Sequence, residues 1–194
     1  MISKNLLLIR KMVGIAVLIA LTIVLTFISN YITIAGISIN LSVLPVALAG
    51  ILYGPLAGLF VGLVNGGLVL LAPATAGYIA TNVWATIIVC LLKTGLAGLC
   101  SGFLFRLLYK RYFSLGVVIA SILTPIINTG LFILGSLLFF GGLFGTLITI
   151  FISVNFIIEF SVIIVCCPTI IFLIKTLMKN YQDFFSIDDP KAKK

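Results

Sequence analysis

Apolar stretches separated by short polar or turn-forming segments make up most of this chain. They cover about residues 11–28, 41–53, 56–71, 83–109, 115–140 and 147–177. A helix needs about 20 mostly apolar residues to cross a bilayer. Gly54-Pro55 separates the second stretch from the third, because the residue before a proline disfavours helix. The pattern predicts an all-α membrane protein, a bundle of six transmembrane helices forming one transmembrane domain over residues 1–194.

Basic residues gather at the ends of these stretches. They are Lys4, Arg10 and Lys11, then Arg106, Lys110 and Arg111, then Lys175 and Lys179, and finally Lys191, Lys193 and Lys194. Cytoplasmic loops of membrane proteins carry an excess of lysine and arginine. We therefore predict that both termini and the connection 106–111 are cytoplasmic, and that 180–194 is a polar cytoplasmic tail. The net charge of +8 then reflects orientation in the membrane, and no nucleic-acid partner is expected.

Composition narrows the class further. Hydrophobic residues make up 62% of the chain and charged residues only 8%, whereas soluble domains have about 25% charged residues. The chain has no histidine, and its four cysteines lie in apolar stretches without the spacing of metal ligands. We expect neither a metal site nor a histidine-dependent catalytic site. The chain also lacks a phosphate-binding glycine-rich motif, so it is not expected to hydrolyse ATP or to be an enzyme.

Outside loops are predicted at 29–42, 72–82 and 141–146. In the first, Tyr31–Ile34 and Ile37–Asn40 alternate as strands do, with Ala35-Gly36 as the turn. A small hairpin and a loop partly inserted into the membrane both fit this pattern. This segment joins the first two helices. Because it carries no charge, we expect it to be a lid over a cavity.

Two charged residues, Lys93 and Glu159, lie in the middle of apolar stretches. A charge at the centre of a bilayer costs roughly 2.5–3.5 kcal/mol, so it usually faces a partner or a wet cavity. Counted from the outer helix ends, both lie roughly 15–18 Å deep, and Asn128 lies at the same level. Asn65 and Asn155 lie higher, at roughly 10 Å. This polar layer predicts a small-molecule pocket open to the outside.

The residues expected to bind the ligand are Asn40, Asn65, Tyr78, Trp84, Lys93, Asn128, Asn155 and Glu159. Trp84 also suits an interfacial aromatic belt. Ala16 and Ala20 are four residues apart and let another helix approach closely, either within the protein or from a partner.

Three interpretations of the polar layer remain open. In the first, Lys93 and Glu159 form an ion pair that only fixes helix packing. In the second, the chain is a stand-alone secondary transporter that uses Glu159 as a proton or cation site. In the third, it is a binding subunit that captures a solute and depends on a partner for energy.

Through several segments, the chain resembles the substrate-binding S component of energy-coupling-factor (ECF) transporters. This resemblance favours the third interpretation. The segments are Ala16-x-x-x-Ala20, Asn40-Leu41-Ser42-Val43-Leu44-Pro45, Tyr53-Gly54-Pro55-x-x-Gly58, Lys93-Thr94-Gly95-Leu96-Ala97-Gly98 and Asn155-x-x-x-Glu159. The resemblance covers nearly the whole chain.

The resemblance implies a function and a set of partners. Such subunits bind a water-soluble vitamin or cofactor precursor at the outer face of the bacterial plasma membrane, under the first outside loop. Alanines matching Ala16 and Ala20 dock on a transmembrane coupling protein. Two cytoplasmic ATPases drive the cycle, so ATP is bound only by partner subunits and this chain needs no cofactor. The identity of the ligand does not follow from the resemblance.

Overall fold

The computed structural model describes residues 4–31, 33–34, 37–38, 40–109, 112–140 and 143–180, with only the backbone described for 4, 7, 33–34, 37–38, 143–155, 173 and 177–180. The elements are α1 (Lys4–Tyr31), β1 (Thr33–Ile34), β2 (Ile37–Ser38), α2 (Val43–Tyr53), α3 (Pro55–Leu70), a 3-10 turn η1 (Pro73–Thr75), α4 (Ala76–Thr81), α5 (Val83–Tyr109), α6 (Phe113–Phe139) and α7 (Leu143–Asn180). The described part of the chain is helical apart from one two-stranded hairpin.

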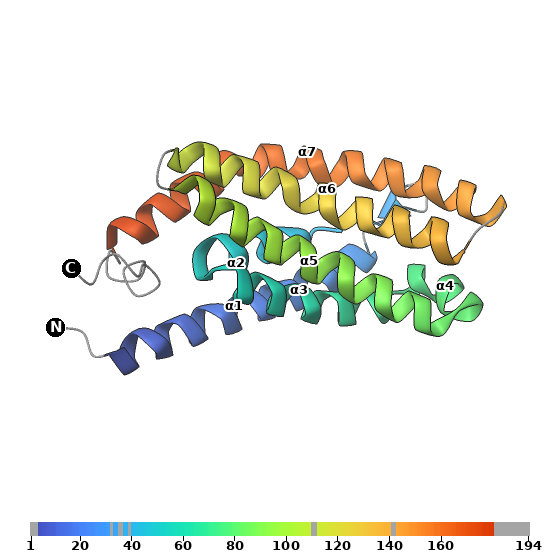
Figure 1. Ribbon diagram of the computed structural model, residues 1–194, viewed down its shortest axis with the longest axis horizontal. Coiled ribbons are helices and arrows are strands. Elements are labelled where there is room, and N and C mark those ends of the chain that lie inside the picture. Colours follow the sequence, from blue (N-terminus) through green and yellow to red (C-terminus); the bar gives the residue numbers. More distant parts are fainter. Residues whose placement is uncertain are drawn as a thin grey trace.

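The helices form an elongated bundle (Figure 1). α5 lies between α3 and α6, and α6 packs against α7. α1 runs along the side of α2 and α3. The start of α1, the corner between α2 and α3, and the end of α7 lie at one end of the bundle, and α4 lies at the opposite end. We call these the corner end and the α4 end.

Four helices of the described chain are long and apolar enough to cross a membrane, over Leu8–Tyr31, Val83–Tyr109, Phe113–Phe139 and Phe156–Thr176. α2 has 11 residues and α3 has 16, about 16 Å and 24 Å of helix, so each is shorter than a hydrocarbon core of about 30 Å. α3 and the segment Pro73–Thr81 form a fifth candidate span, bent by 75°. The described residues therefore have the predicted helical architecture, with four candidate membrane spans, or five if the bent pair is one span, and the sixth span stays a prediction.

Large apolar side chains cover much of the outside of the bundle, and its interior holds polar as well as apolar side chains. Leu56, Phe60, Val165 and Phe172 are among the exposed large apolar residues. Buried polar residues include Asn65, Lys93, Asn128 and Glu159, together with several threonines and serines of α1, α5 and α6. This distribution suits a lipid environment, where buried polar groups face one another rather than hydrocarbon.

Close approach of α3 and α5 depends on glycine. A Cβ on Gly58 would overlap with the carbonyl oxygen of Gly98, and a Cβ on Gly62 would overlap with that of Thr94. Small residues allow helix backbones to approach closely in membranes. Gly58, Gly62 and Gly66, which lie four residues apart on α3, therefore bring the one polar residue of this helix, Asn65, against α5.

The structure agrees with the prediction for one outside segment and differs from it for the other two. β1 and β2 pair antiparallel, with Thr33 opposite Ser38, so the hairpin is the alternative that the structure contains. Its predicted turn, Ala35-Gly36, lies outside the described residues. The prediction of a loop over 72–82 is wrong for most of that segment, because η1 and α4 occupy it. The turn predicted through Thr146 is also wrong, because α7 already begins at Leu143.

Candidate functional site

Lys93 lies in the middle of α5 with its side chain enclosed by the bundle. Only 7% of the residue is exposed, and its Nζ lies 4.0 Å from the centre of the Phe132 ring on α6. Glu159 on α7 is 3% exposed and attracts Lys93 electrostatically. The two charges that the sequence places in separate stretches thus belong to one buried site between α5, α6 and α7.

Aromatic rings extend this site toward the α4 end of the bundle. The Tyr78 ring centre lies 5.4 Å from that of Phe132 and 5.4 Å from that of Phe140, in tilted and edge-on arrangements. Such arrangements are favourable for aromatic pairs. Tyr78 therefore connects α4 with the ring that contacts the Lys93 cation.

Two asparagines face each other across the bundle on another side of α5. Asn65 and Asn128, with Thr94 and Thr124, line an internal gap of about 150 Å³ that has no room for a water molecule. Among the described residues, the Asn65 Nδ2 and Asn128 Oδ1 atoms have no hydrogen-bond partner. An unsatisfied buried polar group costs about 1–3 kcal/mol. Each asparagine therefore has one side-chain atom at the gap, a donor on Asn65 and an acceptor on Asn128, that forms no hydrogen bond within the described structure.

Threonine hydroxyls complete this polar gap. Thr94 donates to the carbonyl of Cys90 at 2.9 Å, and Thr124 donates to that of Ala120 at 2.8 Å. The Thr26 hydroxyl on α1 lies 3.4 Å from Asn65 Oδ1. The protons of Thr94 and Thr124 thus serve their own helices, as hydroxyls in helices commonly do, while both residues line the gap.

Local sequence explains why these groups meet. Gly62 and Gly66 on α3 allow its backbone to reach α5 near Thr94 and Cys90, which brings Asn65 to the gap. Pro125 inside α6 has no N–H, so it leaves a carbonyl of the preceding turn without its helical donor. Thr124 precedes that proline and Asn128 follows it by one turn, so α6 presents both to the gap.

The structure brings together most of the predicted layer. Lys93, Asn128, Glu159 and Asn65 are all buried, and Tyr78 is half-buried against the Phe132 ring that contacts Lys93. Asn65 lines the same gap as Asn128, although counting residues along the helices separates the two by about 5–8 Å.

The other three predicted residues have different outcomes. Trp84 is 76% exposed, so the structure does not bring it to the buried site, and its position fits the interfacial belt. Asn40 accepts a short hydrogen bond from the Ser42 hydroxyl, just before α2. The Asn155 side chain lies outside the described residues.

Ala16 and Ala20 lie on the exposed side of α1. The buried side of this helix carries Leu18, Thr22 and Thr26 instead. The described residues therefore do not support the interpretation that the alanine pair packs within this chain. The alanine pair faces the surroundings of the bundle, where a partner helix has access to it.

Sequence reasoning missed Thr26, Thr94, Thr124 and Phe132. A signal for the threonines is present, because each is a polar residue within an apolar stretch at the depth of the asparagines. No comparable signal marks Phe132, which is one of 15 phenylalanines. Its role depends only on which side of α6 faces Lys93.

The chemistry of the site is that of recognition. No group of three or more histidine, cysteine, aspartate or glutamate residues that could hold a metal is found in the described chain. The groups present are one cation, one carboxylate, two amides, hydroxyl oxygens and aromatic rings. Together they offer charge, donors, acceptors and stacking surfaces to a small polar molecule.

Comparison with known proteins adds one finding. A family model described as "ECF transporter, substrate-specific component" matches residues 10–171, a range that includes every candidate site residue named above. No curated protein and no solved structure matches the chain.

Proposed function

Because the chain belongs to the family of ECF transporter substrate-specific components, we propose that it captures a water-soluble vitamin or cofactor precursor from outside the cell. The family identifies a membrane-embedded transport subunit that binds a substrate, and not an enzyme. The observation that carries the ligand proposal is the burial of Asn65, Lys93, Asn128 and Glu159 from four helices in a bundle with an apolar exterior.

Lys93 and Glu159 suit a ligand with charged or strongly polar groups, and the amides suit its neutral donors and acceptors. Asn128 and Asn65 present unsatisfied atoms for this purpose. We assign Asn155 to the same site, because it lies one helical turn before Glu159. Tyr78 supplies an aromatic wall, and the β1–β2 hairpin with Asn40 forms the lid.

The proposed topology has six spans, with α2 and α3 as a pair of short ones that meet at Gly54-Pro55. The start of α1 and the end of α7 lie together at the corner end, where the basic residues concentrate. Positive residues favour the cytoplasmic side. We therefore place both termini in the cytoplasm of a bacterium and the α4 end outside.

Transport then depends on partners. The exposed Ala16 and Ala20 are proposed to dock on a transmembrane coupling protein, because small residues permit close helix contact. Two cytoplasmic ATPases supply the energy, so ATP and other cofactors are assigned to the partners and not to this chain.

Reconstitution in liposomes tests this proposal. The protein alone should bind one member of a panel of radiolabelled vitamins with nanomolar affinity and should not transport it. ATP-dependent uptake should appear only after a coupling protein and two ATPases are added. Gradient-driven uptake by the protein alone would instead support the secondary transporter, and the absence of any binding across the panel would overturn the ligand proposal.

A further inference from the structure

A second cavity lies at the corner end of the bundle, away from the buried polar site. It has a volume of about 390 Å³ and lies between α1, the corner joining α2 to α3, and the last turn of α5. Its polar lining includes Lys11, Tyr53 and Arg106, and its apolar lining includes Ile15, Leu56 and Phe60. The cavity therefore combines two cations with an apolar wall.

The two cations lie at the depth of a membrane surface. Lys11 follows the first residue of the candidate span Leu8–Tyr31 by three positions, and Arg106 precedes the last residue of Val83–Tyr109 by three. At the rise of an α-helix, each is about 4.5 Å inside the end of its span. Two helices that run in opposite directions thus bring their cations to one level.

Two glycines make room for the polar side chains of this cavity. A Cβ on Gly54 would overlap with Nη2 of Arg106, and a Cβ on Gly14 would overlap with the Tyr53 hydroxyl. Gly54 also has a φ of 100°, a conformation that favours glycine. Arg106 therefore lies directly against the backbone of the corner, and Tyr53 lies directly against that of α1.

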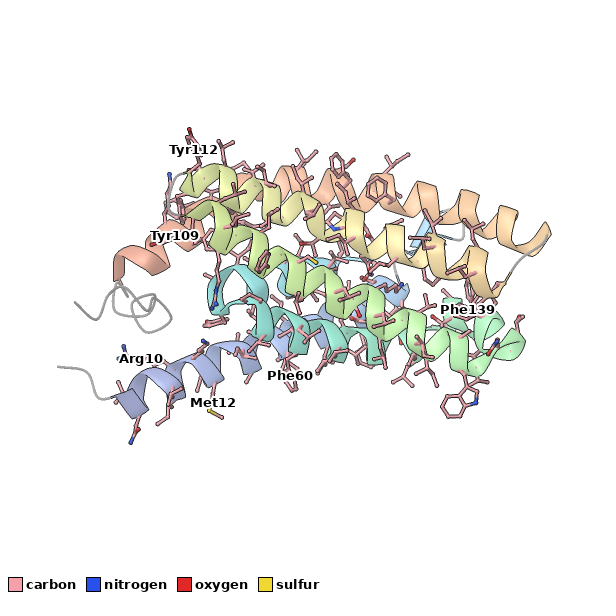
Figure 2. All side chains as sticks on the ribbon, in the orientation of Figure 1. Arg10, Met12, Phe60, Tyr109, Tyr112 and Phe139 are labelled. Atoms are coloured by element: carbon pink, nitrogen blue, oxygen red, sulfur yellow. The ribbon has the colours of Figure 1, made fainter. Side chains whose placement is uncertain are left out.

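The apolar wall continues onto the surface of the bundle. Leu56 is 78% exposed and Phe60 is 56% exposed. Figure 2 shows Phe60 and Met12 projecting from the same edge of the molecule, away from α6 and α7. A molecule with a charged head in the cavity would have its apolar part along this surface.

We propose that this cavity binds the phosphodiester headgroup of an anionic phospholipid. Lys11 and Arg106 contact the phosphate, since arginine and lysine are the side chains that bind phosphate oxygens in proteins. Tyr53 donates its hydroxyl to the headgroup, and an acyl chain follows Ile15, Leu56 and Phe60. The site is separate from the ligand pocket and does not depend on which solute is carried.

Native mass spectrometry of the purified, delipidated protein tests the proposal. Phosphatidylglycerol and phosphatidylcholine with identical acyl chains are titrated separately. We expect one phosphatidylglycerol to bind at least tenfold more tightly than phosphatidylcholine. The double variant Lys11→Gln/Arg106→Gln should lose this preference, whereas Lys11→Arg/Arg106→Lys should retain it and so exclude a simple folding defect.

The matched control is Arg10→Gln/Lys175→Gln, which removes the same charge from exposed residues outside the cavity lining. An equal loss in this control would overturn the proposal, because it would indicate unspecific attraction. Glycerol phosphate binding as tightly as phosphatidylglycerol would also overturn it in favour of a soluble anion. If the cavity variant kept its lipid affinity but no longer bound the coupling protein, the proposal would be overturned. Lys11 and Arg106 would then be assigned to an acidic residue of that partner.

Discussion

The side-chain nitrogen of Lys93 lies 4.0 Å from the centre of the Phe132 ring, inside the helix bundle. An aromatic face attracts a cation through the ring quadrupole, by about 2 kcal/mol or more when the pair is shielded from water. Glu159 adds a second electrostatic attraction from α7. Both attractions oppose the cost of removing the lysine from water, which is the largest effect on this residue.

Substitution of Phe132 should destabilise the fold through this contact. We expect Phe132→Leu to lower the free energy of unfolding by about 2 kcal/mol, because the cation loses its aromatic partner. Thermal unfolding of the purified protein measures this effect. Phe139→Leu is the matched control, since Phe139 lies on the same helix and is exposed. Equal melting temperatures for the two variants would contradict a stabilising role for the Lys93–Phe132 contact.

Asn128 should matter for the ligand more than for the fold. Asn128→Leu removes a buried oxygen that has no hydrogen-bond partner within the described structure, so stability should be unchanged or slightly higher. Ligand affinity should fall about tenfold if one hydrogen bond is lost. Isothermal titration and thermal unfolding separate the two effects.

Ser136 provides the control for this experiment. Its hydroxyl on α6 is likewise buried and unsatisfied within the described structure, but it does not line the gap beside Asn65. Ser136→Ala should leave ligand affinity intact. If Asn128→Leu also binds ligand normally, Asn128 is not a ligand contact.

The glycines of α3 should differ sharply in their tolerance of substitution. In Gly62→Ala the new Cβ overlaps with the backbone carbonyl of Thr94, and we expect a loss of about 1–3 kcal/mol in stability. In Gly67→Ala the Cβ meets nothing within 4 Å, and the better helix propensity of alanine should stabilise by up to about 1 kcal/mol. Opposite shifts in melting temperature are the expected result, and a common sign would contradict it.

The exposed alanines of α1 should affect coupling alone. We expect Ala16→Leu/Ala20→Leu to bind ligand with normal affinity but to lose uptake in the presence of the coupling protein and ATPases. Gly130→Leu adds a bulky side chain to an exposed position of α6 and should preserve both activities. Loss of ligand binding in the alanine variant would show that these residues support the fold instead.

The helical membrane architecture and most of the buried site could be predicted from the sequence. Lys93 and Glu159 are conspicuous because each is a charge in a long apolar segment, and burial follows from the cost of exposing it to lipid. The α4 helix could not be predicted, since Gly77 and Pro73 are equally typical of a loop. The placement of Trp84 also could not be decided, because an aromatic residue at a helix end suits a belt and a binding wall alike.

By itself, the sequence determined which long segments are helical and that their apolar character suits a membrane. These properties follow from hydropathy, which acts along a single segment. Only the tertiary structure decided that Phe132 faces Lys93, that Asn65 meets Asn128, and that Ala16 remains exposed. Such pairings depend on how each helix is rotated about its axis, and that rotation is set by close contacts between segments distant in sequence, such as Gly62 against Thr94.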